Sequence, residues 1–424
     1  MRESEVLIRE LTEGKYDAIL KDIYMDESQI SRQRSRYAEA VKQYEKIFGA
    51  GKVAVYSAPG RSEVGGNHTD HQHGRVLAAS VNLDAVAVAG YSSGNCFRIV
   101  SEGYAMEEIG LSDLGKRQSE EGTSLGLIRG VLKGLTDRGY HIGGCSIYVT
   151  SDVLSGSGLS SSASFETILG TVLSGMFNDG KISPVEIAMT GQYAENVYFD
   201  KPCGLMDQMA CSVGGMIYID FQDPSCPEIE QMDLGTDEYS LCIVDTKGSH
   251  SDLTEDYAMI PQEMKKVAGF FGKEVLRQVD EKKFYQEIPH LRQKLGDRCV
   301  LRAMHFFAEN RRVKEQMEAL KRHDFAEFLE MVRDSGNSSF KYLQNVYTNR
   351  DVQNQSVSIA LAVSESILKE NGVCRVHGGG FAGTIQAFVR DNFVEEYKGK
   401  IEDVFGSGAC HVLKVRKSGG VQVI

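Results

Sequence analysis

Apolar and polar residues alternate along the chain in patterns that predict a mixture of helices and strands. Apolar residues recur at helical spacing over 39–48, and Gly49 and Gly51 are expected to end that helix. The β-branched run VAVYSAPG predicts a strand that breaks at Pro59-Gly60, and VLAASVNLDAVAVAGY predicts a second, buried strand. The polar segment between these two strands is therefore expected to be a loop.

A second pattern predicts a strand, a glycine loop and a helix in succession. The sequence SIYVT at 146–150 has the alternation of a strand, and DVLSGSGLSSSAS follows at 152–164. Apolar residues then recur at three- and four-residue steps, which predicts a helix that begins at the serine cluster: Phe165, Ile168, Leu169, Val172, Leu173, Met176 and Phe177. Free backbone N–H groups at such a helix start favour a bound anion. The alternative is that the serines only cap the helix and the glycines only form a turn.

The predicted loop over 60–74 is unusually rich in polar side chains. It contains arginine, carboxylate, amide and imidazole groups: Arg61, Glu63, Asn67, His68, Asp70, His71 and His73. Such groups suit the hydroxyls of a sugar, each of which donates and accepts hydrogen bonds. Two other interpretations stay open, namely a solvated surface loop and a metal site built from the histidines and Asp70.

A third set of polar residues follows the serine helix. Ser183-Pro184-Val185-Glu186 has the pattern of a capping box, so a helix is expected from there to about Glu195. The later segment CGLMDQM, 203–209, carries Asp207 among small and apolar residues. We expect Asp207 to be buried and paired with Arg61, although an Asp that caps a helix is an alternative.

Length and composition limit the classes of protein that the chain can belong to. With 424 residues and 42% hydrophobic content the chain is expected to form two domains, over 1–235 and 236–424. A formal charge of −12 argues against nucleic acid as a partner. The N-terminus has no apolar signal segment, no run is long enough to cross a membrane, and the nine cysteines form no C-x-x-C pair. These features predict a cytoplasmic protein with reduced thiols and no membrane partner.

Several motifs together resemble the GHMP kinase family, in particular its galactokinase branch. They are APGR with the histidine-aspartate loop, GSGLSSSAS, PCGLMDQ and HGGGFAG at 377–383, and the resemblance covers roughly 53–215 and 370–390. The resemblance implies an α+β fold of two domains. The N-terminal domain would be of the ribosomal protein S5 domain 2-like type and the C-terminal domain ferredoxin-like α/β, with the active site in the cleft between them.

The resemblance also implies an activity. A galactokinase-like sugar kinase uses ATP and Mg²⁺ to phosphorylate a free hexose at the anomeric C1 hydroxyl, with galactose as the leading candidate. The alternatives are a related kinase for galacturonate or an N-acetylhexosamine, and a catalytically silent regulator that senses sugar and ATP. The expected partners are the small sugar and ATP, and the expected assembly is a monomer or a weak homo-oligomer.

Each motif residue acquires a role from the resemblance. Asp207 and Arg61 would be catalytic, and Ser162 and Glu195 would hold Mg²⁺. The nucleotide would be bound by Gly156, Ser157, Gly158, Leu159, Ser160, Ser161, Ser162 and Gly379. The sugar would be bound by Glu63, Asn67, His68, Asp70, Gly204 and Tyr257.

The chain departs from the family pattern at the sugar loop. Glu63 stands where the family has asparagine, Asn67 stands where it has glutamate, and His71 replaces a tyrosine. Since the first two lie four residues apart, we expect them to meet in space with their roles exchanged. Two further family segments, S-H-x-S-L and C-P-E-L-D, have only degraded counterparts near 336–340 and 351–355, so the sugar remains open.

Overall fold

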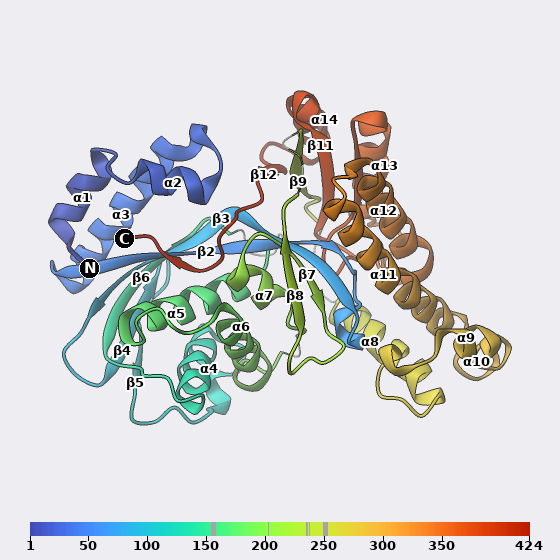
Figure 1. The fold of residues 1–424 in the computed structure, drawn as a ribbon, viewed down its shortest axis with the longest axis horizontal. Helices are drawn as coiled ribbons and strands as arrows, with labels where there is room; N and C mark the ends of the chain where they lie inside the picture. Colours follow the sequence, from blue (N-terminus) through green and yellow to red (C-terminus); the bar gives the residue numbers. More distant parts are fainter. Residues whose placement is uncertain (154–157, 202, 235, 237, 249–252) are drawn as a thin grey trace.

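The computed structural model describes residues 1–424 except 154–157, 202, 235, 237 and 249–252, and its strands form two sheets (Figure 1). In the larger sheet the strands follow the order β1-β2-β3-β6-β4-β5, while β13 pairs with β2, β7 pairs with β3, and β8 pairs with β7. These strands are β1 (Arg2–Glu3), β2 (Lys52–Gly65), β3 (Arg75–Tyr91), β4 (Cys96–Ser101), β5 (Glu107–Gly110), β6 (Cys145–Ser151), β7 (Met216–Asp220), β8 (Glu228–Met232) and β13 (Val421–Gln422).

The larger sheet is covered on both faces because its strands bury alternate residues on opposite sides. Val53 and Val55 of β2 pack against α1 (Ser4–Thr12), α2 (Asp17–Tyr24) and α3 (Ile30–Phe48). Ala54 and Tyr56 pack on the other face, and the helices after β5 lie there, below the sheet in Figure 1. These helices are α4 (Ser124–Asp137), α5 (Ser161–Phe177), α6 (Pro184–Tyr193) and α7 (Met206–Val213).

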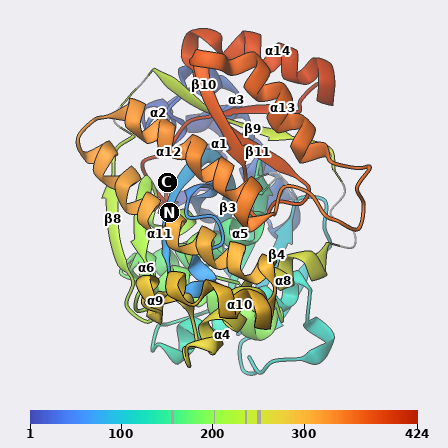
Figure 2. The same ribbon diagram turned by 90° about the vertical axis from the view of Figure 1, so that its right-hand side faces the viewer.

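The smaller sheet has the order β10-β11-β9-β12 and pairs its strands antiparallel throughout. Its strands are β9 (Tyr239–Asp245), β10 (Gly372–Val376), β11 (Thr384–Arg390) and β12 (Cys410–Leu413). Long helices stand in front of it when the molecule is seen from the right of Figure 1 (Figure 2). The helices of this half are α8 (Thr254–Phe270), α9 (Glu281–Gln286), α10 (Ile288–Leu295), α11 (Asp297–Lys321), α12 (Phe325–Ser338), α13 (Ser356–Leu368) and α14 (Val394–Phe405).

One hydrophobic cluster joins the two halves. Val64 and Leu77, at the far ends of β2 and β3, pack in the same cluster as Ile243 of β9, Val313 of α11 and Phe388 of β11. The long strands β2 and β3 therefore carry the polar residues at their ends into the region between the two sheets (Figure 1).

Most of the elements expected from the sequence are present. The strand at 146–150 is β6, the helix from the serine cluster is α5, and Ser183 and Glu186 form a complete capping box at the start of α6. The helix expected over 39–48 ends at Phe48, with Gly49 as its C-cap residue. The α+β character that the resemblance implies is also present, with one sheet in each half. The domain boundary at 235 stays a prediction.

Two expectations about element bounds are wrong. The helix α3 begins at Ile30 rather than near 39, because its polar first turns are held by tertiary ion pairs of Arg34 with Asp17 and of Arg36 with Asp84. The strand β2 does not break at Pro59-Gly60 but continues to Gly65, and register shifts on either side of Arg61 accommodate the proline. Arg61 and Glu63 thus lie on a strand, not in a loop. Among the described residues, no helix combines the length and apolar character required to span a membrane.

Candidate active site

The helix α5 begins with a turn that its own side chains do not cap. Ser160, the residue before the helix, has a left-handed backbone with φ 58° and makes no side-chain capping hydrogen bond. The first backbone N–H groups of an α-helix have no acceptor within the helix, so this end is suited to an anion. Of the alternative that the serines only cap this helix, the structure tests Ser160, which makes no such bond. Gly156 and Ser157, predicted to bind the nucleotide, lie outside the described residues.

Asp207 lies directly beside the start of α5. Arg61 holds its carboxylate in a bidentate ion pair, with Nε 2.7 Å from Oδ1 and Nη2 2.6 Å from Oδ2, and Ser160 Oγ donates to Oδ2 at 2.6 Å. Arg61 also donates from Nη1 to the carbonyl of Gly158, and its backbone N–H donates to the carbonyl of Leu159 at 3.0 Å. Arg61 thus binds both the carboxylate of Asp207 and the glycine-serine segment that leads into α5, residues 158–160.

The Asp207 carboxylate is paired but remains accessible. Its side chain is 31% exposed, whereas that of Arg61 is 8% exposed, so the expectation of full burial is wrong for Asp207. Although burial opposes it, the charge and hydrogen bonds of Arg61 and the Ser160 hydroxyl lower the pKa of Asp207 below its usual value. The carboxylate is therefore ionised at neutral pH and can contact a ligand.

Ser162, in the first turn of α5, meets Glu195. Ser162 Oγ donates to Glu195 Oε1 at 3.0 Å, Lys201 Nζ lies 2.7 Å from the same oxygen, and Gln208 Nε2 donates to Oε2 at 3.0 Å. Glu195 lies in a π-helical turn, Ala194–Tyr198, that extends α6. A hydroxyl and a carboxylate are oxygen ligands of the kind that Mg²⁺ takes, so the two predicted metal ligands suit it in chemistry. Their metal-binding role stays a prediction.

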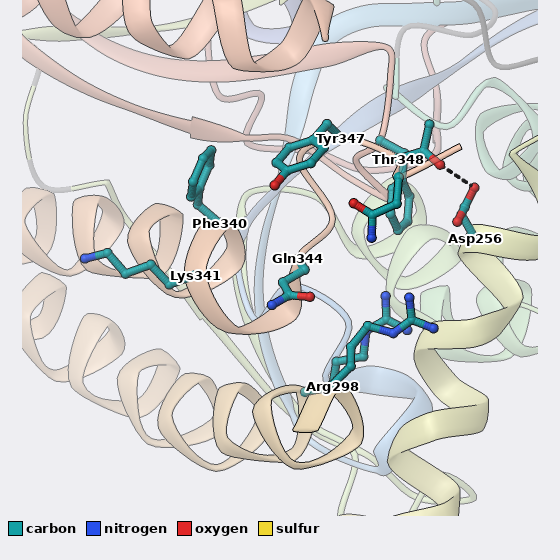
Figure 3. Close-up of a pocket in the computed structure, with 10 residues that line it drawn as sticks. Asp256, Arg298, Phe340, Lys341, Gln344, Tyr347 and Thr348 are labelled. Atoms are coloured by element: carbon teal, nitrogen blue, oxygen red, sulfur yellow. Dashed lines mark hydrogen bonds between the residues drawn. The ribbon is translucent and has the colours of Figure 1, made fainter. Parts of the chain in front are cut away.

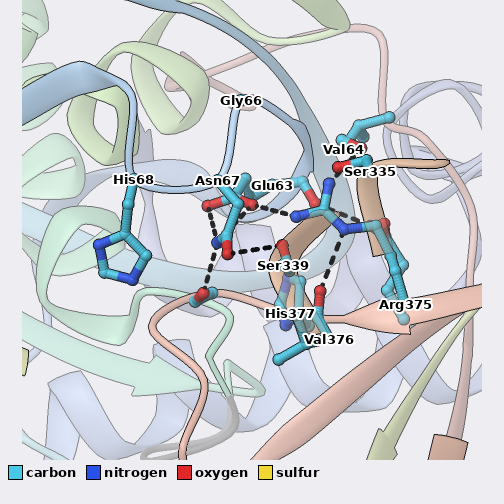
Figure 4. Close-up of polar contacts among 12 residues, drawn as sticks. Glu63, Val64, Gly66, Asn67, His68, Ser335, Ser339, Arg375, Val376 and His377 are labelled. Carbon is cyan, nitrogen blue, oxygen red and sulfur yellow. Dashed lines mark hydrogen bonds and ion pairs between the residues drawn. The ribbon is translucent and has the colours of Figure 1, made fainter. Parts of the chain in front are cut away.

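Glu63 and Asn67 meet as expected, but they are buried in a network between the two halves (Figure 4). Asn67 Nδ2 donates to Glu63 Oε1 at 3.0 Å and to the carbonyl of Gly378 at 2.7 Å, and Arg375 Nη2 lies 2.6 Å from Glu63 Oε1. Burial raises the pKa of Glu63 to about 7 despite the opposing charges of Arg375 and Arg61. Both predicted sugar contacts are thus engaged with the protein itself, and a sugar-binding role for them stays a prediction.

The glycine-rich segment 378–380 lies against the polar loop. His68 Nε2 donates to the carbonyl of Gly379 at 3.1 Å, and Asn345 Nδ2 donates to the same oxygen at 3.1 Å. Tyr257 Oη donates to the carbonyl of Gly380 at 2.9 Å, and its ring lies where a Cβ on Gly379 would stand. Gly379, predicted to bind the nucleotide, is therefore placed beside the predicted sugar residues His68 and Tyr257.

Asp70 and Gly204 bring the polar loop next to the catalytic segment. A Cβ added to Gly204 would stand 1.8 Å from Asp70 Oδ2, so only glycine permits this approach. Gly204 precedes α7 and its Asp207 by a few residues. Among the residues that the structure describes, no group of three or more His, Cys, Asp or Glu side chains is arranged to hold a metal ion. The metal-site interpretation of the histidine loop thus gains no support.

Four residues of the site were not predicted from the sequence. Lys201 and Gln208 bond to Glu195, and Arg375 and Asn345 bond to Glu63 and Asn67. Arg375 did give a signal, since an arginine within the apolar run GVCRV must be paired if that strand is buried. Asn345 and Lys201 lie in segments without such a pattern.

Comparisons with known proteins agree with this geometry. The model described as the galactokinase galactose-binding signature matches residues 42–91, and that of the GHMP kinases N-terminal domain matches residues 126–215. A galactokinase of Glaesserella parasuis is 30% identical over 358 residues, which cover 83% of this chain and 89% of that one. The chain belongs to the galactokinase family. A galactokinase of Clostridium tetani is 29% identical, with coverage of 86% and 91%.

Solved structures show that the galactokinase fold is shared as well. The crystal structure of Lactococcus lactis galactokinase complexed with galactose superposes with a TM-score of 0.78 at 21% identity, covering 90% of this chain and 99% of that one. Methanococcus jannaschii mevalonate kinase, another GHMP kinase fold, gives a TM-score of 0.61 at 14% identity, with coverage of 86% and 99%. The fold class expected from the motifs is therefore confirmed.

Proposed function

We propose that this member of the galactokinase family uses ATP to phosphorylate the C1 hydroxyl of a free hexose, with galactose as the first candidate. The observation that carries the proposal is the position of Asp207, which is ionised, 31% exposed and bonded to Ser160 at the start of α5. An anion at that helix start and a hydroxyl at that carboxylate would be neighbours. The names of the relatives and the galactose in the Lactococcus lactis structure support the choice of sugar.

Asp207 would act mainly by orienting the sugar hydroxyl. A carboxylate whose pKa is lowered is a weak base, so it is not suited to remove a proton from a free hydroxyl before reaction. In a loose phosphoryl transfer the hydroxyl becomes acidic only as its bond to phosphorus forms. We infer that Asp207 accepts a hydrogen bond from the C1 hydroxyl and receives its proton late.

Arg61 and the start of α5 would stabilise the phosphate charge. Arg61 keeps Asp207 ionised and fixes the carbonyls of Gly158 and Leu159, so the backbone N–H groups that follow are held in place before the nucleotide binds. Ser162 and Glu195 would hold Mg²⁺, which supplies a positive charge to the phosphate oxygens. Lys201 and Gln208 fix the orientation of Glu195.

The charges at the site favour a neutral sugar over galacturonate. Asp207 has its charge balanced by Arg61, whereas Asp70 lies beside Gly204 with His71 Nε2 at 3.6 Å and no Lys or Arg partner among the described residues. An additional carboxylate on the sugar would be repelled there. Glu63 does not change this balance because Arg375 pairs with it.

A substrate panel tests the proposal. The purified chain is incubated with ATP, Mg²⁺ and one of galactose, glucose, N-acetylgalactosamine or galacturonate, and the phosphorylated carbon is identified by ³¹P and ¹³C NMR. We expect galactose 1-phosphate as the main product and no turnover of galacturonate. Binding of sugar and ATP without turnover of any sugar would instead support the sensing regulator.

A further inference from the structure

A pocket of about 330 Å³ lies between α8, α11 and the segment 339–349 (Figure 3). It is lined by Asp256, Arg298, Arg302, Phe340, Lys341, Gln344, Tyr347, Thr348, Asn349 and Phe381. None of these residues has a predicted role in binding sugar, nucleotide or metal. The segment that forms one wall begins within the first of the two places where the chain departs from the family pattern, near 336–340, and ends just before the second, near 351–355.

The pocket has an excess of positive charge on one wall. Arg298 and Arg302 both pair with one buried carboxylate, Glu263, at 2.6 and 2.9 Å. Arg302 is 2% exposed and donates from Nε to the carbonyl of Leu343 at 3.1 Å, while its Nη2 has no partner among the described residues. Both arginines line the pocket, and a guanidinium whose donors are not all used within the protein is suited to recognise a carboxylate or phosphate.

The opposite wall offers amide and aromatic groups. The side chain of Gln344 points toward the middle of the pocket in Figure 3, and the rings of Phe340 and Tyr347 lie 6.2 Å apart at its edge. The one carboxylate of the lining, Asp256, accepts a hydrogen bond from Thr348 at 3.0 Å and lies 3.7 Å from Arg350. Arg350 is itself paired with Glu255, so Asp256 offsets part of the positive charge of the pocket. The lining still holds three cations, Arg298, Arg302 and Lys341, against this one carboxylate.

The pocket is next to the glycine-rich segment 378–380, because Phe381 is one of its lining residues. Phe381 N–H donates to the carbonyl of Asn345 at 2.5 Å, and Asn345 Nδ2 reaches both Asn67 Oδ1 at 2.8 Å and the carbonyl of Gly379 at 3.1 Å. The ring of Phe381 packs edge-on against Tyr257 at 5.4 Å. A molecule bound against Gln344 and Phe381 would thus contact residues that are directly linked to the glycine-rich segment 378–380.

We propose that this pocket is a second ligand site, which binds a small organic anion with a planar ring and stabilises the glycine-rich segment against Asn67 and His68. The binding itself does not depend on the proposed function. Its regulatory effect rests on that function, because the segment it stabilises contains Gly379, a predicted nucleotide residue, and bonds to the predicted sugar residues Asn67 and His68.

A fluorescence titration tests the site. The chain contains no tryptophan, so Phe340→Trp, at a position that is 47% exposed, places a single reporter on the pocket. The probe is phenyl phosphate, titrated while Mg²⁺ and a non-hydrolysable ATP analogue saturate the nucleotide site. We expect a saturable emission change in Phe340→Trp and none in Tyr104→Trp, whose position is 77% exposed and does not line the pocket. Calorimetry on the unmodified chain should give a similar affinity.

Two arginine variants show whether the positively charged wall is responsible for the binding of phenyl phosphate. Arg298→Gln removes one cation but leaves Arg302 to pair with Glu263, so we expect about tenfold weaker binding, the size of one lost charge-assisted contact. Arg292→Gln, an exposed ion-paired arginine outside the pocket, should leave the affinity unchanged. The proposal is overturned if phenyl phosphate does not bind, if the ATP analogue displaces it, or if Arg298→Gln binds as tightly as the unmodified chain. Each result is read without measuring turnover.

Discussion

His68 combines an unusual backbone conformation with a suppressed charge. Its φ of 59° lies in the left-handed region, and burial together with the nearby His71 lowers its pKa from 6.5 to about 3. Between these two pH values the unfolded chain binds a proton at this position that the folded chain does not bind. The contribution of His68 to stability is therefore present above pH 6.5 and is lost as the pH falls toward 3.

The variant His68→Asn should reduce this acid sensitivity. Asparagine tolerates the left-handed conformation and does not titrate, so the drop in unfolding free energy from pH 7.5 to pH 4.5 should shrink by about 2 kcal/mol. Urea unfolding at the two pH values measures it. His323→Asn is a matched control, because His323 also has a positive φ, 55°, but is exposed. An equal pH dependence in all three proteins would show that His68 is not held neutral by the fold.

The glycine-serine segment needs glycine at Gly158 for two reasons. Its φ is 73°, and an added Cβ would stand 2.9 Å from Thr384 Oγ1 and 3.0 Å from His377 Nδ1. His377 is buried and is also bonded to Ser62 on β2 at 3.1 Å, so it cannot easily move away. A side chain at 158 must therefore displace the segment that leads into α5.

Gly158→Ala should raise the KM for ATP by about tenfold or more, because it misplaces backbone N–H groups that would bind phosphate. Gly180→Ala provides the comparison, since Gly180 also has a positive φ, 69°, but open space around it. The control should lose about 1 kcal/mol of stability and keep its KM. Initial rates over a range of ATP concentrations give the KM of both variants. An unchanged KM in Gly158→Ala would mean that this segment does not bind the nucleotide.

At the scale of elements, local patterns in the sequence predicted the helices and strands that are determined by residues close together in the chain. The apolar spacing after Ser164, the capping box at Ser183 and the alternation in β6 all gave elements that the structure contains. The first half of α3 and the continuation of β2 past Pro59 could not be found in this way. Both depend on partners far away in the sequence, namely Asp84 for Arg36 and the β3 strand for β2.

At the scale of the whole molecule, the end of the chain returns to the larger sheet. Arg416 is fully buried, donates from Nη1 to Ser57 Oγ at 2.7 Å and lies 3.3 Å from Asp84 Oδ2, and β13 then pairs with β2. Asp84 also pairs with Arg36 of α3. Nothing in the local sequence near 416 indicates this contact, since it joins residues separated by most of the chain.

Arg416→Met tests how much the contacts of the C-terminal segment with the larger sheet contribute to the free energy of unfolding. Methionine fills a similar volume but leaves the buried Asp84 with one cation fewer, so the free energy of unfolding should fall by about 2–4 kcal/mol. Arg117→Met, at a half-exposed arginine, should change it by no more than about 0.5 kcal/mol. Chemical denaturation compares the two variants. Equal stability of both would mean that the C-terminal segment contributes little to the fold.

The central claim is that the ionised Asp207 beside the start of α5 orients the hydroxyl that receives the phosphoryl group. Its most direct test is the kcat for galactose phosphorylation by Asp207→Asn, measured together with the dissociation constant for ATP. The substitution keeps the shape of the side chain, so ATP should bind within about fivefold of the unmodified chain, while kcat should fall by at least about 10²-fold. A kcat close to that of the unmodified chain would contradict the account.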